Sequence, residues 1–163
     1  MASTVVTTDP SETLRIVGLG SCVAIVLRHV QVPLVGVGHF MLPRRALGVQ
    51  DESDDKFVDA GLGAMVVKLA RRAEHSMELE ALLVGGSRMF RGLGAGAGIG
   101  RRNVQAATES LEEHGIPLVG GDVGGTLSRN LLVKACGREV SVALLGQAGA
   151  PLTAWFDREE PQT

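Results

Sequence analysis

Short apolar runs separated by glycine and proline predict a chain built largely of β-strands. The runs are rich in Val, Leu and Ile and are too short for helices, so they are typical of strands bounded by turns. Seven segments follow this pattern, namely residues 14–19, 22–28, 34–42, 80–86, 116–119, 130–135 and 139–145. The polar segment 1–12 that precedes them is expected to form a loose tail or an edge strand.

Between these runs, one long segment changes to the period of a helix. Over residues 55–75, apolar side chains recur at intervals of three and four residues and share one face. The members of this face are Val58, Leu62, Met65, Val66, Leu69 and Ala73. Ser53 or Asp54 is expected to cap the start of the helix. Gly61 and Gly63 lower the helical propensity, and we expect them to mark close packing on a sheet.

A second helix is expected over residues 101–114. Val104, Ala107 and Leu111 face inward, and Gly115 terminates the helix. The resulting order is strands, helix, strand, helix and strands. It predicts an α/β sandwich of the α+β type, in which two helices pack on a mixed or antiparallel sheet.

Length and composition narrow the class of protein. A chain of 163 residues suits one domain. Its core is expected over about 14–146, with tails at 1–12 and 151–163. A net charge of -2 without a basic stripe argues against nucleic-acid binding. No apolar run is long enough to insert into a membrane, and no signal peptide is expected. Two cysteines, Cys22 and Cys136, do not form a disulfide framework, so a reducing cytoplasm is expected.

Cys22 is the first candidate for chemistry, because it follows the glycine-rich turn Gly-Leu-Gly-Ser. Two glycines and a serine before a strand favour a tight turn. In such a turn, backbone N–H groups near Gly20, Ser21 and Cys22 can converge on a carbonyl oxygen and form an oxyanion hole. The alternative is that Cys22 is a small buried apolar residue at the start of a strand. These residues taken alone leave both interpretations open.

His39 favours the reactive interpretation. If the strands flanking the loop His29–Val32 pair so that Arg28 lies opposite Pro33, then Cys22 lies opposite His39. Directly opposed residues share a face, with Cβ atoms ~4.5–5.5 Å apart. An imidazolium at that distance lowers the pKa of the thiol, and the imidazole can later protonate the leaving group and activate water. The pair therefore predicts hydrolysis of an amide side chain, which converts glutamine to glutamate.

A glycine-rich segment at residues 92–100 suggests a different function, that of a small nucleotide-binding protein. It contains G-x-G-x-x-A between a strand and a helix, with Asp122 after the next strand. However, the acid follows later than the usual spacing of ~20 residues, and only one βαβ unit is visible. We therefore favour a mobile surface loop and expect no cofactor. Cysteine and histidine spacing predicts no metal site.

Several remaining residues are assigned structural roles. His29, His75 and His114 are typical of surface or capping positions. The Asp-Val-Gly-Gly segment at residues 122–125 is typical of a turn. Cys136 is expected in a tight hairpin between the last two strands, without a functional role. Trp155 and Phe156 are expected to form a small apolar cluster.

Six motifs together carry a family resemblance. They are GLGSC at 18–22, GHFMLP at 38–43, KFVDAG at 56–61, VGGSRMF at 84–90, IGRRN at 99–103 and GGDVGG at 120–125. In this order and at these spacings they resemble the CheD family, the chemoreceptor glutamine deamidases of bacterial chemotaxis. Each motif alone is weak, but the set is specific and extends over roughly residues 14–146.

The resemblance implies an activity and its partners. Cys22 would be the nucleophile and His39 the general base of a protein-glutamine glutaminase. The substrate would be glutamine side chains in the cytoplasmic regions of chemoreceptors, which become methyl-accepting glutamates. The resemblance also implies a methylesterase side activity and a complex with CheC, a phosphatase of the response regulator. The fold would be similar to that of bacterial toxin deamidases.

One position departs from the family pattern. The resemblance implies a catalytic threonine six positions before the cysteine, where this chain has Ile16. Thr13 lies three residues earlier, and this odd offset places it on the other face of a strand. A main-chain carbonyl could orient His39 instead. The sequence therefore leaves two alternatives: an active deamidase, or an adaptation module with weak or no catalysis that binds receptors or CheC.

Overall fold

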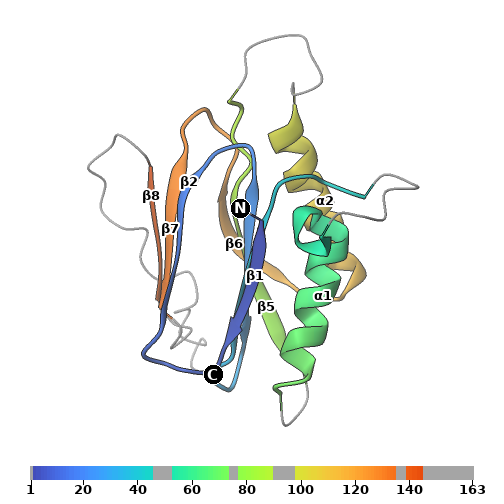
Figure 1. The fold of residues 1–163 in the computed structure, drawn as a ribbon, viewed down its shortest axis with the longest axis vertical. Helices are drawn as coiled ribbons and strands as arrows, with labels where there is room; N and C mark the ends of the chain where they lie inside the picture. The colour runs from blue at the N-terminus through green and yellow to red at the C-terminus, as the bar shows by residue number, and fades with distance from the viewer. Residues whose placement is uncertain (1, 46–52, 74–76, 90–97, 135–138, 145–163) are drawn as a thin grey trace, which may run out of the picture.

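The computed structural model describes residues 2–45, 53–73, 77–89, 98–134 and 139–144, and its elements form three layers (Figure 1). The strands are β1 (Ser3–Thr7), β2 (Thr13–Leu19), β3 (Val23–His29), β4 (Val35–Phe40), β5 (Leu79–Gly85), β6 (Leu118–Val123), β7 (Arg129–Lys134) and β8 (Glu139–Leu144). The helices are the short 3-10 helix η1 (Asp54–Lys56), α1 (Val58–Ala70) and α2 (Ile99–Glu113).

Two separate sheets form two of the layers. The first has five strands in the order β1-β4-β3-β5-β6, and only its β5–β6 pair is parallel. The second has three antiparallel strands in the order β2-β7-β8. Helices α1 and α2 cover one face of the five-stranded sheet, and the three-stranded sheet lies against the other (Figure 1). The predicted α+β sandwich with a mixed sheet and two helices is confirmed.

The central strands β3 and β5 are apolar throughout because they are buried on both faces. In β3, Val23, Ile25 and Leu27 pack against the helices, whereas Ala24 and Val26 pack against the second sheet. β5 alternates in the same way, and its residues between 79 and 85 are buried apart from the partly exposed second position. A strand covered on both faces has no polar face, so its sequence is a continuous hydrophobic run.

Strands of the three-stranded sheet show the opposite pattern because they form an outer layer. In β2, Leu14 and Ile16 pack inward, while Thr13 and Arg15 are exposed. β7 alternates likewise, with Leu131 and Val133 buried between the sheets. Alternation of this kind is expected for an antiparallel strand with one face in solvent.

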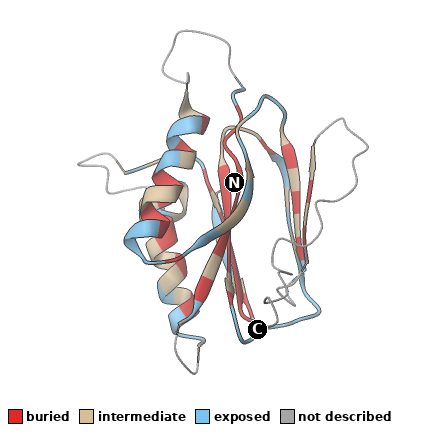
Figure 2. Cartoon of the chain, turned by 180° about the vertical axis from the view of Figure 1, so that it is seen from behind, coloured by how far each residue is buried: buried red, intermediate tan, exposed pale blue. Residues whose placement is uncertain are grey.

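Both helices bury the faces that the sequence predicts. Of the α1 face, Val58, Leu62, Met65 and Leu69 are buried, and the other two members are partly buried against the same core. In α2, Ala107 and Leu111 are buried and Val104 packs against the core. Figure 2 shows that buried and exposed segments alternate along the helices, as expected of helices with one face against the sheet.

Helix ends differ in part from the prediction. Gly115 follows α2 with a φ of 64°, as expected of a glycine that ends a helix. The predicted cap of α1 is wrong: the Ser53 side chain accepts a hydrogen bond from the Asp55 N–H and caps η1. α1 itself begins after Phe57, which has no capping side-chain bond, because η1 interrupts the predicted helical run.

Three other segments refine the prediction. Residues 3–7 form an edge strand paired with β4, which is one of the two expected alternatives for the N-terminal segment. The expected turn at 122–125 begins two residues later, because Asp122 and Val123 belong to β6. β7 and β8 pair as predicted. Cys136, His75, Trp155 and Phe156 lie outside the described residues.

Only one of the two glycines in α1 marks a close approach to the sheet. A Cβ atom on Gly61 would lie 2.3 Å from Cε1 of Phe40, which is fully buried. A Cβ atom on Gly63 would meet nothing closer than the His114 ring at 3.8 Å. The expectation of close packing is therefore confirmed at Gly61 and wrong at Gly63.

This difference predicts opposite effects of the same substitution. Gly61→Ala should lower the free energy of unfolding by about 1–3 kcal/mol, because the core is already filled. Gly63→Ala should raise it by about 0.5–1 kcal/mol through helix propensity. Urea denaturation of both variants tests the pair. Equal stability of the two variants would contradict the close contact between α1 and Phe40.

Candidate active site

The turn between β2 and β3 carries Cys22 from the outer sheet to the central sheet. The pairing of β2 with β7 is irregular between Ile16 and Leu19, and Gly18 has a φ of 72° there. Its N–H donates to Oδ1 of Asn130 on β7 at 3.0 Å. A left-handed residue at this point is available to glycine at little cost. The chain can therefore leave one layer and enter the next within a few residues.

Main-chain hydrogen bonds from the residues that follow β5 also hold this turn. Gly86 N–H donates to the carbonyl of Cys22 at 2.8 Å, and Ser87 N–H donates to the carbonyl of Gly20 at 2.9 Å. Gly85 has a φ of 108°, and a Cβ atom there would lie 2.4 Å from the Cys22 carbonyl oxygen. Only glycine fits at this position, so β5 and the turn pack backbone to backbone.

Cys22 and His39 lie on the same side of the five-stranded sheet, but the predicted register is wrong. Arg28 pairs with Val35 rather than with Pro33, so Ala24 is the residue opposite His39. Six residues, 29–34, separate the paired positions Arg28 and Val35, two more than the four expected. A shift of two keeps each side chain on its face, and Cys22 takes a diagonal position to His39. Such neighbours lie roughly 7–8 Å apart, within reach of an aromatic side chain.

The four candidate residues are partly accessible. Gly20, Ser21, Cys22 and His39 all have intermediate exposure. Cys22 is a free cysteine that packs at the edge of the cluster between the sheets. The Nε2 atom of His39 is buried, although the residue as a whole is not. Cys22 and His39 therefore lie at the border between the core and solvent.

Burial raises the pKa of the Cys22 thiol above its ordinary value. This direction differs from the lowered pKa that a preformed thiolate–imidazolium pair gives. Burial therefore favours the neutral thiol over the thiolate in the free protein. A nucleophilic role for Cys22 then requires a base that removes the proton when the substrate is bound.

Sequence reasoning missed a buried network that supports this end of the sheet. Arg129 is buried and forms an ion pair with Asp122, with 2.6 Å between Nη2 and Oδ1. Its Nη1 donates to Oγ of Ser87 at 2.6 Å and to the carbonyl of Gly124 at 2.9 Å. Ser87 is the residue whose N–H holds Gly20. Asp122 therefore serves a structural ion pair, and the GGDVGG and VGGSRMF motifs were the available signal.

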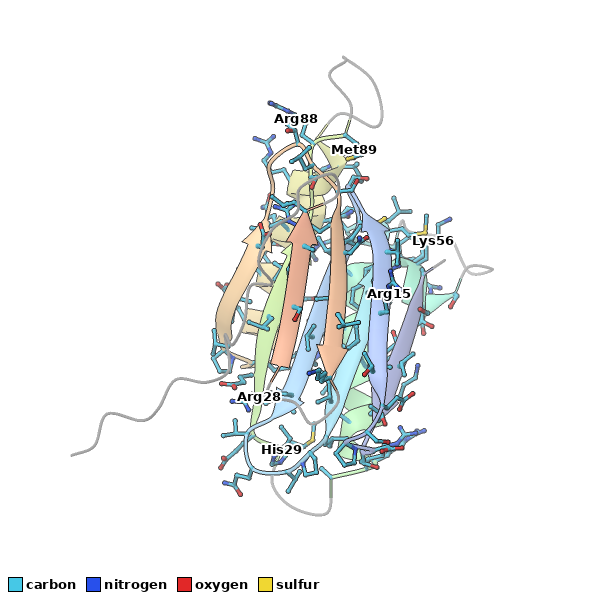
Figure 3. The ribbon with its side chains drawn as sticks, turned by 90° about the vertical axis from the view of Figure 1, so that its left-hand side faces the viewer. Arg15, Arg28, His29, Lys56, Arg88 and Met89 are labelled. Atoms are coloured by element: carbon cyan, nitrogen blue, oxygen red, sulfur yellow. The ribbon has the colours of Figure 1, made fainter. Side chains whose placement is uncertain are left out.

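Two cavities lie at different ends of the molecule. One of about 590 Å³ is next to the Cys22 turn, and its lining includes Gly86, Arg88 and Arg101. Another of about 710 Å³ lies beside the β3–β4 loop and is lined in part by His29 and Arg72. Figure 3 shows Arg88 and Met89 at one end of the sheets and His29 at the other. Neither cavity includes Cys22 or His39 in its lining.

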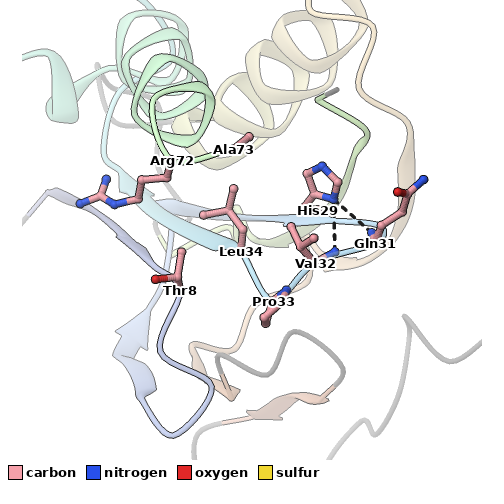
Figure 4. Close-up of a pocket in the computed structure, with 8 residues that line it drawn as sticks. All are labelled: Thr8, His29, Gln31, Val32, Pro33, Leu34, Arg72 and Ala73. Carbon is pink, nitrogen blue, oxygen red and sulfur yellow. Dashed lines mark hydrogen bonds between the residues drawn. The ribbon is translucent and has the colours of Figure 1, made fainter. Parts of the chain in front are cut away.

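The larger cavity contains a histidine with a structural role. His29 is buried, and its Nδ1 accepts the N–H of Gln31 at 3.1 Å and that of Val32 at 3.4 Å (Figure 4). A ring nitrogen that accepts two main-chain N–H groups stabilises the loop. His29 is therefore a capping residue, as the sequence suggested. His114 likewise contacts its own helix, with Nδ1 2.8 Å from the Ser110 carbonyl oxygen.

Other kinds of site receive little support from the residues that the structure describes. Among these residues, no three His, Cys, Asp or Glu side chains cluster in a way that could hold a metal ion. The G-x-G-x-x-A segment at 92–97 lies outside the described residues, and nucleotide binding stays a prediction. In the described part of the chain, no helix is both long and apolar enough to cross a bilayer.

The fold and this site define a class of α+β protein in which a glycine turn presents a free cysteine at the end of a mixed sheet. Residues 41–143 match the family described as CheD chemotactic sensory transduction. This match spans more than half of the chain, and the chain belongs to the CheD family. The matched region begins after His39, so the family match itself does not include Cys22 or His39.

Individual relatives extend the similarity over most of the chain. A protein from Haloarcula marismortui named probable chemoreceptor glutamine deamidase CheD is 36% identical over 130 residues, which are 80% of this chain and 74% of that protein. The chemoreceptor glutamine deamidase CheD of Halalkalibacterium halodurans is 37% identical over 75% of this chain and 77% of its own length. A probable chemoreceptor glutamine deamidase CheD 2 from Geobacter metallireducens is 43% identical over 70% of this chain and 72% of its own.

The raised pKa predicts how Cys22 reacts with iodoacetamide. A cysteine is alkylated as the thiolate, so a raised pKa leaves less thiolate at neutral pH. The rate for Cys22 should increase with pH and reach its midpoint above about 8.5, the value for an exposed thiol. Mass spectrometry of the Cys22 peptide over a pH series measures this rate. The Cys22→Ser variant is the control, because Cys136 is then the only cysteine that iodoacetamide can alkylate. A midpoint at or below the ordinary value would contradict the effect of burial.

Proposed function

We propose that this protein deamidates glutamine side chains in the cytoplasmic regions of chemoreceptors, with Cys22 as the nucleophile and His39 as the general base. One structural observation carries the proposal. A rigidly held turn presents a partly exposed thiol on the same side of the sheet as a histidine. The names of the relatives support the substrate, because they describe chemoreceptor glutamine deamidases.

The first half of the reaction forms a thioester. His39 takes the proton of the Cys22 thiol, and the sulfur attacks the side-chain carbonyl carbon of glutamine. Backbone N–H groups near Gly20 and Ser21 donate hydrogen bonds to the carbonyl oxygen and stabilise the negative charge that develops on it. The C–N bond then breaks, and His39 returns its proton to the departing ammonia.

The second half restores the thiol. His39 removes a proton from water, which attacks the thioester carbonyl; the C–S bond then breaks, and His39 returns the proton to the leaving sulfur. The products are glutamate and ammonia, so one water is consumed for each amide. A methyl ester of glutamate presents the same carbonyl to the thiol and would release methanol. This chemistry accounts for the proposed methylesterase side activity.

The substrate determines the place and partners of the protein in this proposal. Cytoplasmic regions of chemoreceptors are reached from the cytoplasm, where a reduced Cys22 persists. CheC is the second proposed partner, as a regulator of the deamidase. No cofactor or metal is needed, because thiol and imidazole provide both the nucleophile and the proton transfers.

A catalytically weak binding module is the second candidate function. Ile16 favours it, because this side chain packs inward between the sheets and has no group that hydrogen bonds. Thr13 does not replace it, since it is exposed on the outer face of β2. In this second candidate, the protein binds receptors or CheC but turns over slowly.

Mass spectrometry of a receptor cytoplasmic fragment distinguishes the two candidates. The wild-type protein should add about one dalton per modified glutamine, the change from an amide to an acid. Cys22→Ala should add none, because it lacks the nucleophile, and His39→Ala should reduce the rate by about 100-fold or more, as loss of a general base does. A fragment that binds the wild-type protein with no mass change would favour the binding module.

Replacing Ile16 tests the origin of any weakness in catalysis. Ile16→Thr should raise kcat by about tenfold, or 1.4 kcal/mol, because its hydroxyl can orient the imidazole. KM should stay constant, since Ile16 packs inward between the two sheets. Ile16→Val is the matched control, with a similar shape and no hydroxyl. Equal rates for the Thr and Val variants would show that another group already orients His39.

A further inference from the structure

We propose that Asn103 is a positioning residue that holds the Cys22 turn and the His39 strand at a fixed separation. The inference rests on the proposed function of Cys22 and His39. Asn103 lies on α2 and is completely buried. It belongs to a different layer from both segments that it connects, so its role follows from the fold rather than from proximity in the chain.

Two hydrogen bonds carry the inference. Nδ2 of Asn103 donates to the carbonyl of Ser21 at 2.9 Å and to the carbonyl of Met41 at 3.0 Å. Ser21 is the residue immediately before Cys22, and Met41 is two residues after His39. One nitrogen atom therefore links the main chain on both sides of the thiol–imidazole pair.

An asparagine can supply both bonds, whereas other small polar side chains cannot. Its amide nitrogen carries two hydrogens, whereas a serine hydroxyl donates one and an aspartate carboxylate donates none. The two carbonyl acceptors also determine the orientation of the amide, because the opposite orientation would direct its oxygen at both of them. A buried carbonyl that loses its donor costs free energy, so both segments are held in place against α2.

The start of α2 is itself fixed to the same end of β5. A Cβ atom on Gly100 would lie 2.4 Å from the Gly86 carbonyl oxygen and 2.6 Å from that of Ser87. These are the two residues whose N–H groups hold the carbonyls of Cys22 and Gly20. The helix that carries Asn103 and the strand that holds the Cys22 turn thus pack in direct contact. Movement of Asn103 relative to the Cys22 turn would therefore disturb both the packing of α2 on the end of β5 and the hydrogen bonds that hold the turn.

The proposal predicts a specific kinetic signature. Asn103 is buried beneath the site and does not touch the substrate, so its loss should lower kcat and leave KM nearly unchanged. A misplacement of about 1 Å can cost 100-fold in rate, and we expect a decrease of about this size in Asn103→Asp. Asn103→Ala should behave alike. In both variants the released turn should expose the thiol, and Cys22 alkylation at pH 7.5 should become several-fold faster.

Two controls on the same helix separate positioning from general destabilisation. Ser110→Ala changes another buried polar residue, seven positions further along α2. Leu111→Ala removes apolar packing from the core and should lower Tm. Both controls, measured where they are folded, should keep the wild-type kcat and alkylation rate. If Leu111→Ala lost kcat and gained alkylation in proportion to its loss of Tm, the positioning role would be overturned.

A measurement on the wild-type protein tests the inference even if both Asn103 variants fail to fold. The chain contains only two asparagines, Asn103 and Asn130. Selective [15N]asparagine labelling therefore gives two side-chain amide groups in an NMR spectrum. The Asn103 amide protons should be protected from solvent exchange, and their resonances should shift when Cys22 is alkylated. Rapid exchange of these protons in the folded protein would overturn the proposal.

The outcomes distinguish this inference from the proposed function. Wild-type kcat, KM and alkylation in both Asn103 variants would overturn the positioning role while leaving deamidation intact. A wild-type protein that does not deamidate the receptor fragment would refute the proposed function alone. In that case, faster Cys22 alkylation in the variants, together with a protected Asn103 amide, would still support the role of Asn103 in holding the Cys22 turn.

Discussion

The contact between the end of β5 and the β2–β3 turn is the constraint on which the site depends. Gly86 and Ser87 donate their N–H groups to the carbonyls of Cys22 and Gly20. This arrangement needs Gly85, because a side chain there would collide with the Cys22 carbonyl. The cysteine is consequently held by main-chain bonds that do not involve its side chain.

The layered architecture explains why the turn lies at this edge. β2 belongs to the outer sheet and β3 to the central sheet, so the chain between them must cross from one layer to the other. A crossing at the end of a sheet leaves the inter-sheet core intact and places a few residues at its border. Cys22 therefore combines partial exposure with enough burial to raise the pKa of its thiol.

Buried polar groups stabilise the same end of the molecule from two directions. Arg129 pairs with Asp122 and bonds Ser87, while Asn103 bonds the carbonyls beside Cys22 and His39. Nη1 of Arg129 and Nδ2 of Asn103 donate to loops that pass close to the candidate site, and these bonds offset part of the cost of burying the two polar side chains.

Local patterns in the sequence determined the elements, because burial on one or both faces leaves a periodic trace along the chain. The apolar runs of β3 and β5, the buried faces of α1 and α2 and the glycine stop after α2 were all predictable in this way. Only the tertiary structure decided how the elements meet. The β3–β4 register differed from the prediction by two residues, and Asn103 contacts Ser21 and Met41 across separations of 82 and 62 residues. Such contacts depend on the packing of distant layers, which leaves no periodic signal in the sequence.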